Sequence, residues 1–172
     1  MEGRCQCGSV HFTTPLPQPL KIFICHCLEC RRQSASAFGI TAIFPAFELE
    51  QSQSKTHSHS TNASGGGACA TQSSSSGTEE AQEQAKAQTK DNENSIGIYE
   101  HNNTKSGRTK KCYFCKNCGT RLMHGGGPYV AVKGGCLEAL SRDMLDSAMH
   151  IWTKRAVVPI PEGVLAFPED PV

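Results

Sequence analysis

Apolar residues along this chain fall in short runs, many with a period of two, and proline- or glycine-rich turns separate them. Near the N-terminus, Val10 and Phe12 alternate with polar neighbours, which is the pattern of a half-buried strand. Further strands are predicted over stretches rich in β-forming residues, at 20–24, 38–44, 96–99, 109–114, 121–124, 129–133 and 150–152, with 47–49 as a candidate short strand. Residues 137–148 are the one stretch with a helical pattern. Many short strands with little helix predict an all-β fold.

Residues 51–95 interrupt this pattern, because they contain no Val, Ile, Leu, Met or aromatic residue. Such a segment buries too little apolar surface to offset the entropy lost on ordering, so we predict a disordered, low-complexity insertion. Cys69 within it is expected to be a free, exposed thiol. Residues 1–50 and 96–172 are then predicted to form one domain, with the insertion in a loop whose closure entropy grows only slowly with length.

The charge balance of the chain disfavours two classes of partner. Its 172 residues carry 17 Lys and Arg against 16 Asp and Glu, a net charge of +1, so no basic excess favours nucleic acid or an anionic membrane. No apolar run approaches the roughly 20 residues that span a bilayer, and no apolar segment typical of a signal peptide follows Met1. We therefore expect a cytoplasmic protein in a reducing compartment.

Ten cysteines change the picture, since most of them fall in C-x-C and C-x-x-C pairs. This close spacing favours metal chelation over disulfides between distant strands. Cys5 and Cys7 supply one pair and Cys115 and Cys118 another, and together they would complete a four-thiolate zinc site. A closed site of this kind is structural, and it would tie the first strand to the chain beyond the insertion.

A second cluster contains only three cysteines, Cys25, Cys27 and Cys30. Three thiolates leave one corner of a zinc tetrahedron open, as in a catalytic site, where the metal can hold a thiolate from solution or activate water. The alternative is a closed site that another protein group completes, for which the candidates are His26, Cys112, His124 and His150.

Arg31 and Arg32 directly follow this cluster. A guanidinium fork matches a carboxylate, so the two arginines are candidate anion contacts beside the metal. The alternative is a pair of solvated arginines that offset the charge of the thiolates.

These motifs together resemble one known family. In order they are Cys5-x-Cys7-Gly8-x-Val10-x-Phe12, Cys25-His26-Cys27-x-x-Cys30-Arg31-Arg32, Ser36-Ala37-Phe38, Phe114-Cys115-x-x-Cys118-Gly119-Thr120 and His150-Ile151-Trp152. The chain is similar to the glutathione-dependent formaldehyde-activating enzymes, a family that also contains the centromere protein V domain. The resemblance covers nearly the whole chain apart from the polar insertion, and it departs at Ala35, where many relatives have glycine.

The resemblance implies a β-tent fold of small antiparallel sheets and two Zn²⁺ ions per chain. It assigns Cys5, Cys7, Cys115 and Cys118 to a structural zinc and Cys25, Cys27 and Cys30 to a catalytic zinc. It also implies a carbon–sulfur lyase that joins glutathione to formaldehyde, giving S-(hydroxymethyl)glutathione. We therefore expect an enzyme acting on glutathione or another small thiol and a small aldehyde. The alternative is a non-catalytic, zinc-stabilised interaction module.

Overall fold

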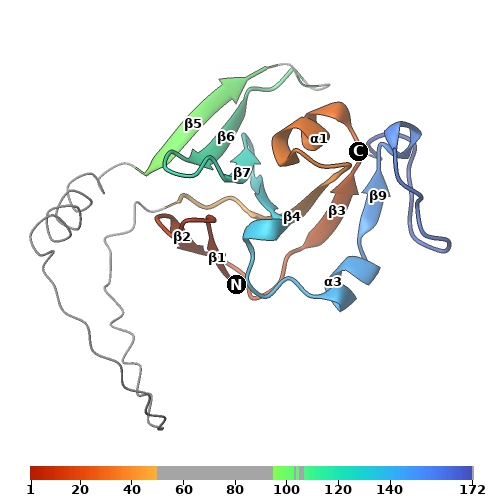
Figure 1. Ribbon diagram of the computed structural model, residues 1–172, viewed down its shortest axis with the longest axis horizontal. Coiled ribbons are helices and arrows are strands. Elements are labelled where there is room, and N and C mark those ends of the chain that lie inside the picture. The colour runs from red at the N-terminus through yellow and green to blue at the C-terminus, as the bar shows by residue number, and fades with distance from the viewer. Residues whose placement is uncertain (50–94, 103, 105–106, 172) are drawn as a thin grey trace, which may run out of the picture.

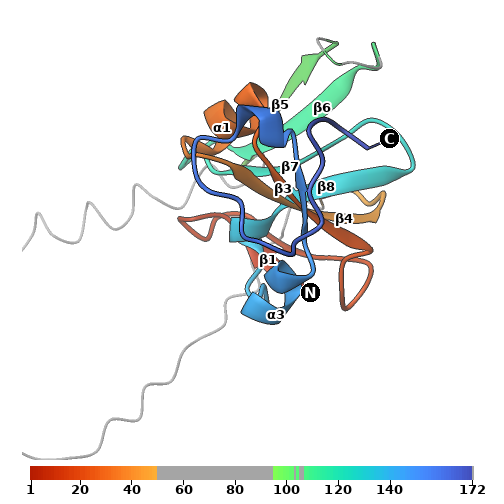
Figure 2. The ribbon, with the colours of Figure 1, turned by 90° about the vertical axis from the view of Figure 1, so that its right-hand side faces the viewer.

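Strands dominate residues 1–49, 95–102, 104 and 107–171, the part of the chain that this computed structural model describes (Figures 1 and 2). The strands are β1 (Glu2–Arg4), β2 (His11–Thr13), β3 (Lys21–Cys25), β4 (Gly39–Pro45), β5 (Ile96–His101), β6 (Lys110–Cys115), β7 (Arg121–Gly125), β8 (Tyr129–Lys133) and β9 (Met149–Ile151). The helices are short: α1 (Leu28–Ser34), α3 (Arg142–Asp146) and the 3-10 turns η2 (Gly134–Cys136) and η3 (Thr153–Arg155). The expectation of a mainly β fold is confirmed.

The strands form one large sheet and one small hairpin. The large sheet has seven strands in the order β5-β6-β7-β8-β4-β3-β9, and β1 pairs with β2 separately. Neighbouring strands are antiparallel except β3 and β9, which run parallel. The predicted insertion, including Cys69, lies outside the described residues, except for its last residue, Ser95.

One face of the large sheet carries the apolar core. Ala42, Val132 and Met123 stand opposite one another across β4, β8 and β7, and all three are buried. They belong to a single core cluster with Val10 and Phe12 of the first hairpin region. The N-terminal hairpin region, through Val10 and Phe12, therefore covers this face of the sheet.

The other face of the sheet carries both polar and apolar side chains and meets α1. Because alternate side chains point to opposite faces, Lys133 shares this face with its register partner Thr41. The Lys133 Nζ donates a 2.8 Å hydrogen bond to Oε1 of Gln33 in α1. Gly39 lets α1 lie close to β4, since a Cβ there would be 3.1 Å from the Cβ of Cys30.

Two sequence expectations need correction, and one helix was missed. Helix α1 was not predicted, because it has seven residues and no buried apolar stripe; its start is instead capped by the Cys27 sulfur, which accepts from the Cys30 N–H. The helix expected over 137–148 is only the five residues of α3, capped by Ser141. Residues 47–49 form no strand.

Within the described residues, no helix combines the length and apolar character that crossing a membrane requires.

Helix α1 ends at Ala35 in the left-handed region, at φ 48° and ψ 40°. Its N–H bonds back to the carbonyls of Arg31 and Arg32, the geometry in which glycine is favoured. The left-handed turn that glycine favours is therefore present here, and Ala35 adopts a strained conformation to form it. Replacing Ala35 by glycine relieves the Cβ strain, and the more flexible unfolded chain offsets part of the gain. We expect Ala35→Gly to raise the unfolding free energy of the metal-loaded protein by about 0.5 to 1 kcal/mol in denaturant titration.

Ala139→Gly is the matched control, because Ala139 is exposed in a turn and has no positive φ. It should lower stability slightly or leave it unchanged. Equal effects of the two substitutions would contradict the strain at Ala35.

The composition of the insertion generates a second prediction. Replacing residues 51–94 by a Gly/Ser linker should leave the fold and the zinc content unchanged, because the segment contributes no large apolar residue to a core. The cut should spare Ser95, whose carbonyl accepts a 2.8 Å hydrogen bond from the Lys116 N–H. Circular dichroism and zinc analysis of the deletion protein would check this, and loss of zinc-loaded protein would contradict it.

Candidate metal centres

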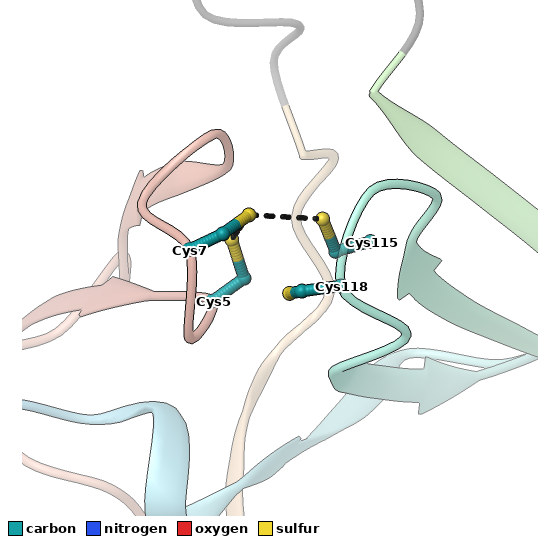
Figure 3. A group of neighbouring side chains, drawn as sticks. All are labelled: Cys5, Cys7, Cys115 and Cys118. Atoms are coloured by element: carbon teal, nitrogen blue, oxygen red, sulfur yellow. Dashed lines mark hydrogen bonds between the residues drawn. The ribbon is translucent and has the colours of Figure 1, made fainter.

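The four-cysteine cluster joins two distant parts of the chain (Figure 3). Cys5 and Cys7 lie just after β1, whereas Cys115 ends β6 and Cys118 lies in the turn before β7. All four sulfurs lie within 4.8 Å of one another. The Cys5–Cys7 and Cys7–Cys115 sulfurs are 3.5 and 3.8 Å apart, and all nine described cysteines are free thiols.

These distances fit zinc and exclude a disulfide. A tetrahedral centre with Zn–S bonds of about 2.3 Å places its sulfurs about 3.8 Å apart, whereas a disulfide needs about 2.0 Å. Four thiolate donors in a compact group are also the donor set of structural zinc. The residues therefore fit a closed zinc site.

Hydrogen bonds around the sulfurs favour their charged form. Val10 N–H donates to Cys5 Sγ at 3.3 Å, and Asn117 Nδ2 donates to Cys7 Sγ at 3.2 Å. Hydrogen bonding with Ser9, and then with Asn117, lowers the pKa of Cys7 to about 5. Cys7 is therefore ready to ligate as a thiolate near neutral pH.

The three-cysteine cluster lies where β3 passes into α1. Cys25 ends β3, Cys27 caps α1 and Cys30 is in its first turn. Their three sulfurs also lie within 4.8 Å of one another. Cys25 is buried, whereas Cys27 and Cys30 are half-buried. The cluster is thus formed by six consecutive residues and remains accessible to solvent on one side.

The three sulfurs share their protons when no metal replaces them. Hydrogen bonds from Cys25 and Cys30 lower the pKa of Cys27 to about 2, and the bond to Cys27 is the main reason why the pKa of Cys25 is raised. Such an arrangement holds one thiolate between two thiols. Zn²⁺ fits this donor set as three thiolate ligands.

No fourth ligand joins this cluster within the described residues. His26 is fully buried, and its Nε2 lies 3.1 Å from Nδ1 of His150 in β9. Burial, and then the neighbouring His150, lowers the pKa of His26, so this pair is neutral. Cys112 and His124 are register partners on β6 and β7, and neither belongs to the group formed by the three sulfurs. The alternative of a site closed by one of these four side chains finds no support.

The histidine pair positions the cysteines. Besides the ring contact, the backbone N–H of His26 donates to the backbone carbonyl of Ile151 in β9 at 3.0 Å. The Phe38 ring lies 5.7 Å from that of His26. Together these contacts fix the peptide that links Cys25 to Cys27, and with it the spacing of the sulfurs.

The two arginines lie on the exposed side of α1. Arg32 bonds to Oε1 of Glu29 at 2.5 Å, so its guanidinium is already paired within the helix. Arg31 is half-buried in the same turn.

Sequence reasoning missed one polar residue, Lys133, on the face that meets α1, and it considered His124 only as a candidate zinc ligand. Burial lowers the pKa of Lys133, and the nearby Cys30 partly counters that effect. His124 has a buried Nδ1 without a hydrogen-bond partner. The alternation of Tyr129, Ala131 and Lys133 against Val130 and Val132 was the available signal, since it assigns Lys133 to the face opposite the core.

The two clusters should respond differently to loss of a ligand. Cys118→Ser breaks the link between the N-terminal hairpin and the sheet, so we expect loss of one zinc and a fall in stability of more than about 3 kcal/mol. Cys27→Ser should lose the other zinc with a smaller effect on unfolding, because that cluster is local in sequence. Zinc analysis with denaturant unfolding would measure both.

Cys112→Ala is the matched control for this pair. Cys112 is a buried thiol outside both clusters, so the variant should keep two zincs per chain. Equal collapse of Cys118→Ser and Cys27→Ser would show that both centres are structural.

Comparison with known proteins assigns the chain that carries this cysteine arrangement to a family. No curated protein matches the chain. The family model described as glutathione-dependent formaldehyde-activating enzyme matches residues 1–72 and 67–155, which include both cysteine clusters, His26 and His150. Most of the chain is covered, and we conclude that it belongs to the glutathione-dependent formaldehyde-activating enzyme family.

Proposed function

We propose that this protein is a zinc-dependent enzyme that joins glutathione, or a related small thiol, to formaldehyde or a related small aldehyde. One observation carries the proposal: three cysteine sulfurs converge within 4.8 Å, and the described residues supply no fourth ligand. A zinc site with three protein ligands leaves a position for substrate. Membership of the family supports glutathione and formaldehyde as the reactants.

The reaction is an addition of a thiol to a carbonyl. The S–H bond breaks and a C–S bond forms, the carbonyl π electrons move to oxygen, and that oxygen takes a proton. Cys25, Cys27 and Cys30 would hold the metal. Zinc in such a site lowers the pKa of a thiol at its open position and thereby supplies the nucleophile near neutral pH.

The chain itself contributes position and charge. The end of β3 and the start of α1 fix the three sulfurs, and the His26–His150 pair holds the peptide between them. This leaves the half-buried side of the cluster for the thiol and the aldehyde to meet in a fixed geometry. Arg31 and Arg32 remain proposed anion contacts, although Arg32 would first have to leave Glu29.

The proposal includes a second, structural zinc on Cys5, Cys7, Cys115 and Cys118, and a cytoplasmic location, where thiols stay reduced. The alternative function is an interaction module in which both zincs are structural. The two differ in whether the three-cysteine metal exchanges its fourth ligand.

Zinc-edge X-ray absorption with and without glutathione tests that difference. We expect two zincs per chain and a rise in the average sulfur coordination from about 3.5 to about 4 when glutathione binds, since one of the two centres gains a thiolate. Two-dimensional exchange NMR should also show faster interconversion of glutathione and its formaldehyde adduct than in buffer.

Cys27→Ser is the control for both measurements, and it should abolish the glutathione-dependent change. Two zincs that are indifferent to glutathione, with exchange no faster than in buffer, would support the interaction module instead.

A further inference from the structure

The sheet face beside the three-cysteine cluster carries the cation Lys133 and the neutral side chain of His124, and the charges of Lys110 and Arg121 act on His124. Cys25 and Gly39 are register partners, and so are Thr41 and Lys133. Since Gly39 and Thr41 are two residues apart on β4, Cys25 and Lys133 belong to the same face of the sheet. His124 joins this face through its register partner Ala131, two residues before Lys133.

The charge of Lys133 interacts with the cysteine cluster. The charges of Cys30 and Cys25 both act to raise its pKa, whereas burial lowers it. Its ammonium bonds to the neutral amide of Gln33 at 2.8 Å, and within the described residues no carboxylate pairs with it. A half-buried cation without an acidic partner is less stable than one that an anion joins.

His124 supplies a second, independent observation. Its Nδ1 is buried and has no hydrogen-bond partner within the described structure. Burial, and then the charges of Lys133, Lys110 and Arg121, lowers the pKa of His124 well below its usual value, so the ring is a neutral donor or acceptor. Buried polar atoms normally have partners, and one without any indicates a group that the structure lacks.

We infer that Lys133 and His124 bind a carboxylate of the thiol substrate, on the sheet face next to the three-cysteine centre. This inference rests on the proposed function and names a recognition site for it. A carboxylate would pair with the Lys133 ammonium and accept from His124, satisfying both groups. Glutathione has two carboxylates, so Arg31, which directly follows Cys30 in α1, remains a candidate contact for the other.

Charge explains why such a site is needed. Three thiolates with Zn²⁺ carry a net charge of −1, and a bound substrate thiolate makes it −2. A substrate carboxylate approaching this centre is repelled, and a fixed cation offsets the repulsion in a region of low dielectric. The face thereby favours acidic thiols over neutral ones.

The test compares thiols with and without carboxylates on the zinc-loaded full chain. Calorimetry would give the Kd of glutathione, of its diethyl ester and of 2-mercaptoethanol for wild type and Lys133→Met. We expect Lys133→Met to weaken glutathione about 10- to 100-fold, because a charge-assisted hydrogen bond is lost. The affinities for the ester and for 2-mercaptoethanol should stay unchanged.

Three further variants make the result specific. Lys133→Arg keeps the charge and should restore part of the glutathione affinity, and His124→Phe should weaken glutathione but not the ester. Lys111→Met is the matched control, since Lys111 is exposed and pairs with Glu100. If Lys133→Met does not fold, salt dependence in wild type decides, because salt should weaken glutathione binding and not ester binding.

The outcomes separate this inference from the function beneath it. Equal loss for glutathione and the ester, or no loss for either, would overturn the carboxylate site while leaving thiol binding intact. Wild-type protein that binds no thiol at all would overturn the proposed function and the inference together.

Discussion

The convergence of sulfur atoms from distant parts of the chain is the constraint on which this fold depends. Cys7 and Cys115 are separated by 108 residues, yet their sulfurs lie 3.8 Å apart. The N-terminal hairpin has only two strands and would be marginal alone. A zinc ion bound by the four-cysteine cluster would hold it over the core face of the large sheet. Residues 51–94 lie within the loop between Cys7 and Cys115. They lengthen that loop by less than a factor of two, at an entropic cost below about 0.6 kcal/mol.

The two cluster types follow from where the cysteines lie on their elements. Turn cysteines from two separate hairpins give four donors and a closed site. A strand end and the first turn of a helix give three donors, because the helix directs the following side chains away. The large sheet then separates two sets of residues, with the apolar core on one face and Lys133 and His124 on the other. Strand alternation alone creates this division.

Much of the fold could be read from the sequence, for identifiable reasons. The strands with strong β-forming runs, such as 129–133, were predicted because their apolar pattern reflects burial on one face. Both cysteine clusters were predicted from spacing, since ligands two or three residues apart can reach one ion. Helix α1 was not, because side-chain capping by Cys27 rather than an apolar stripe forms it. Lys133 was not predicted, and His124 was considered only as a candidate zinc ligand, since their nearness to the cluster arises from strand register across β4, β7 and β8, which no local pattern encodes.

The two centres also differ in when they can form during synthesis. Residues 25–30 leave the ribosome together, so their three thiols can capture a metal before any sheet exists. The four-cysteine cluster must wait for Cys118, and the contacts of His26 with β9 must wait for His150. The growing chain thus passes through a long interval with one local metal ligand set and no scaffold around it. During that interval, early metal capture would protect these thiols from oxidation and from mispairing with later cysteines.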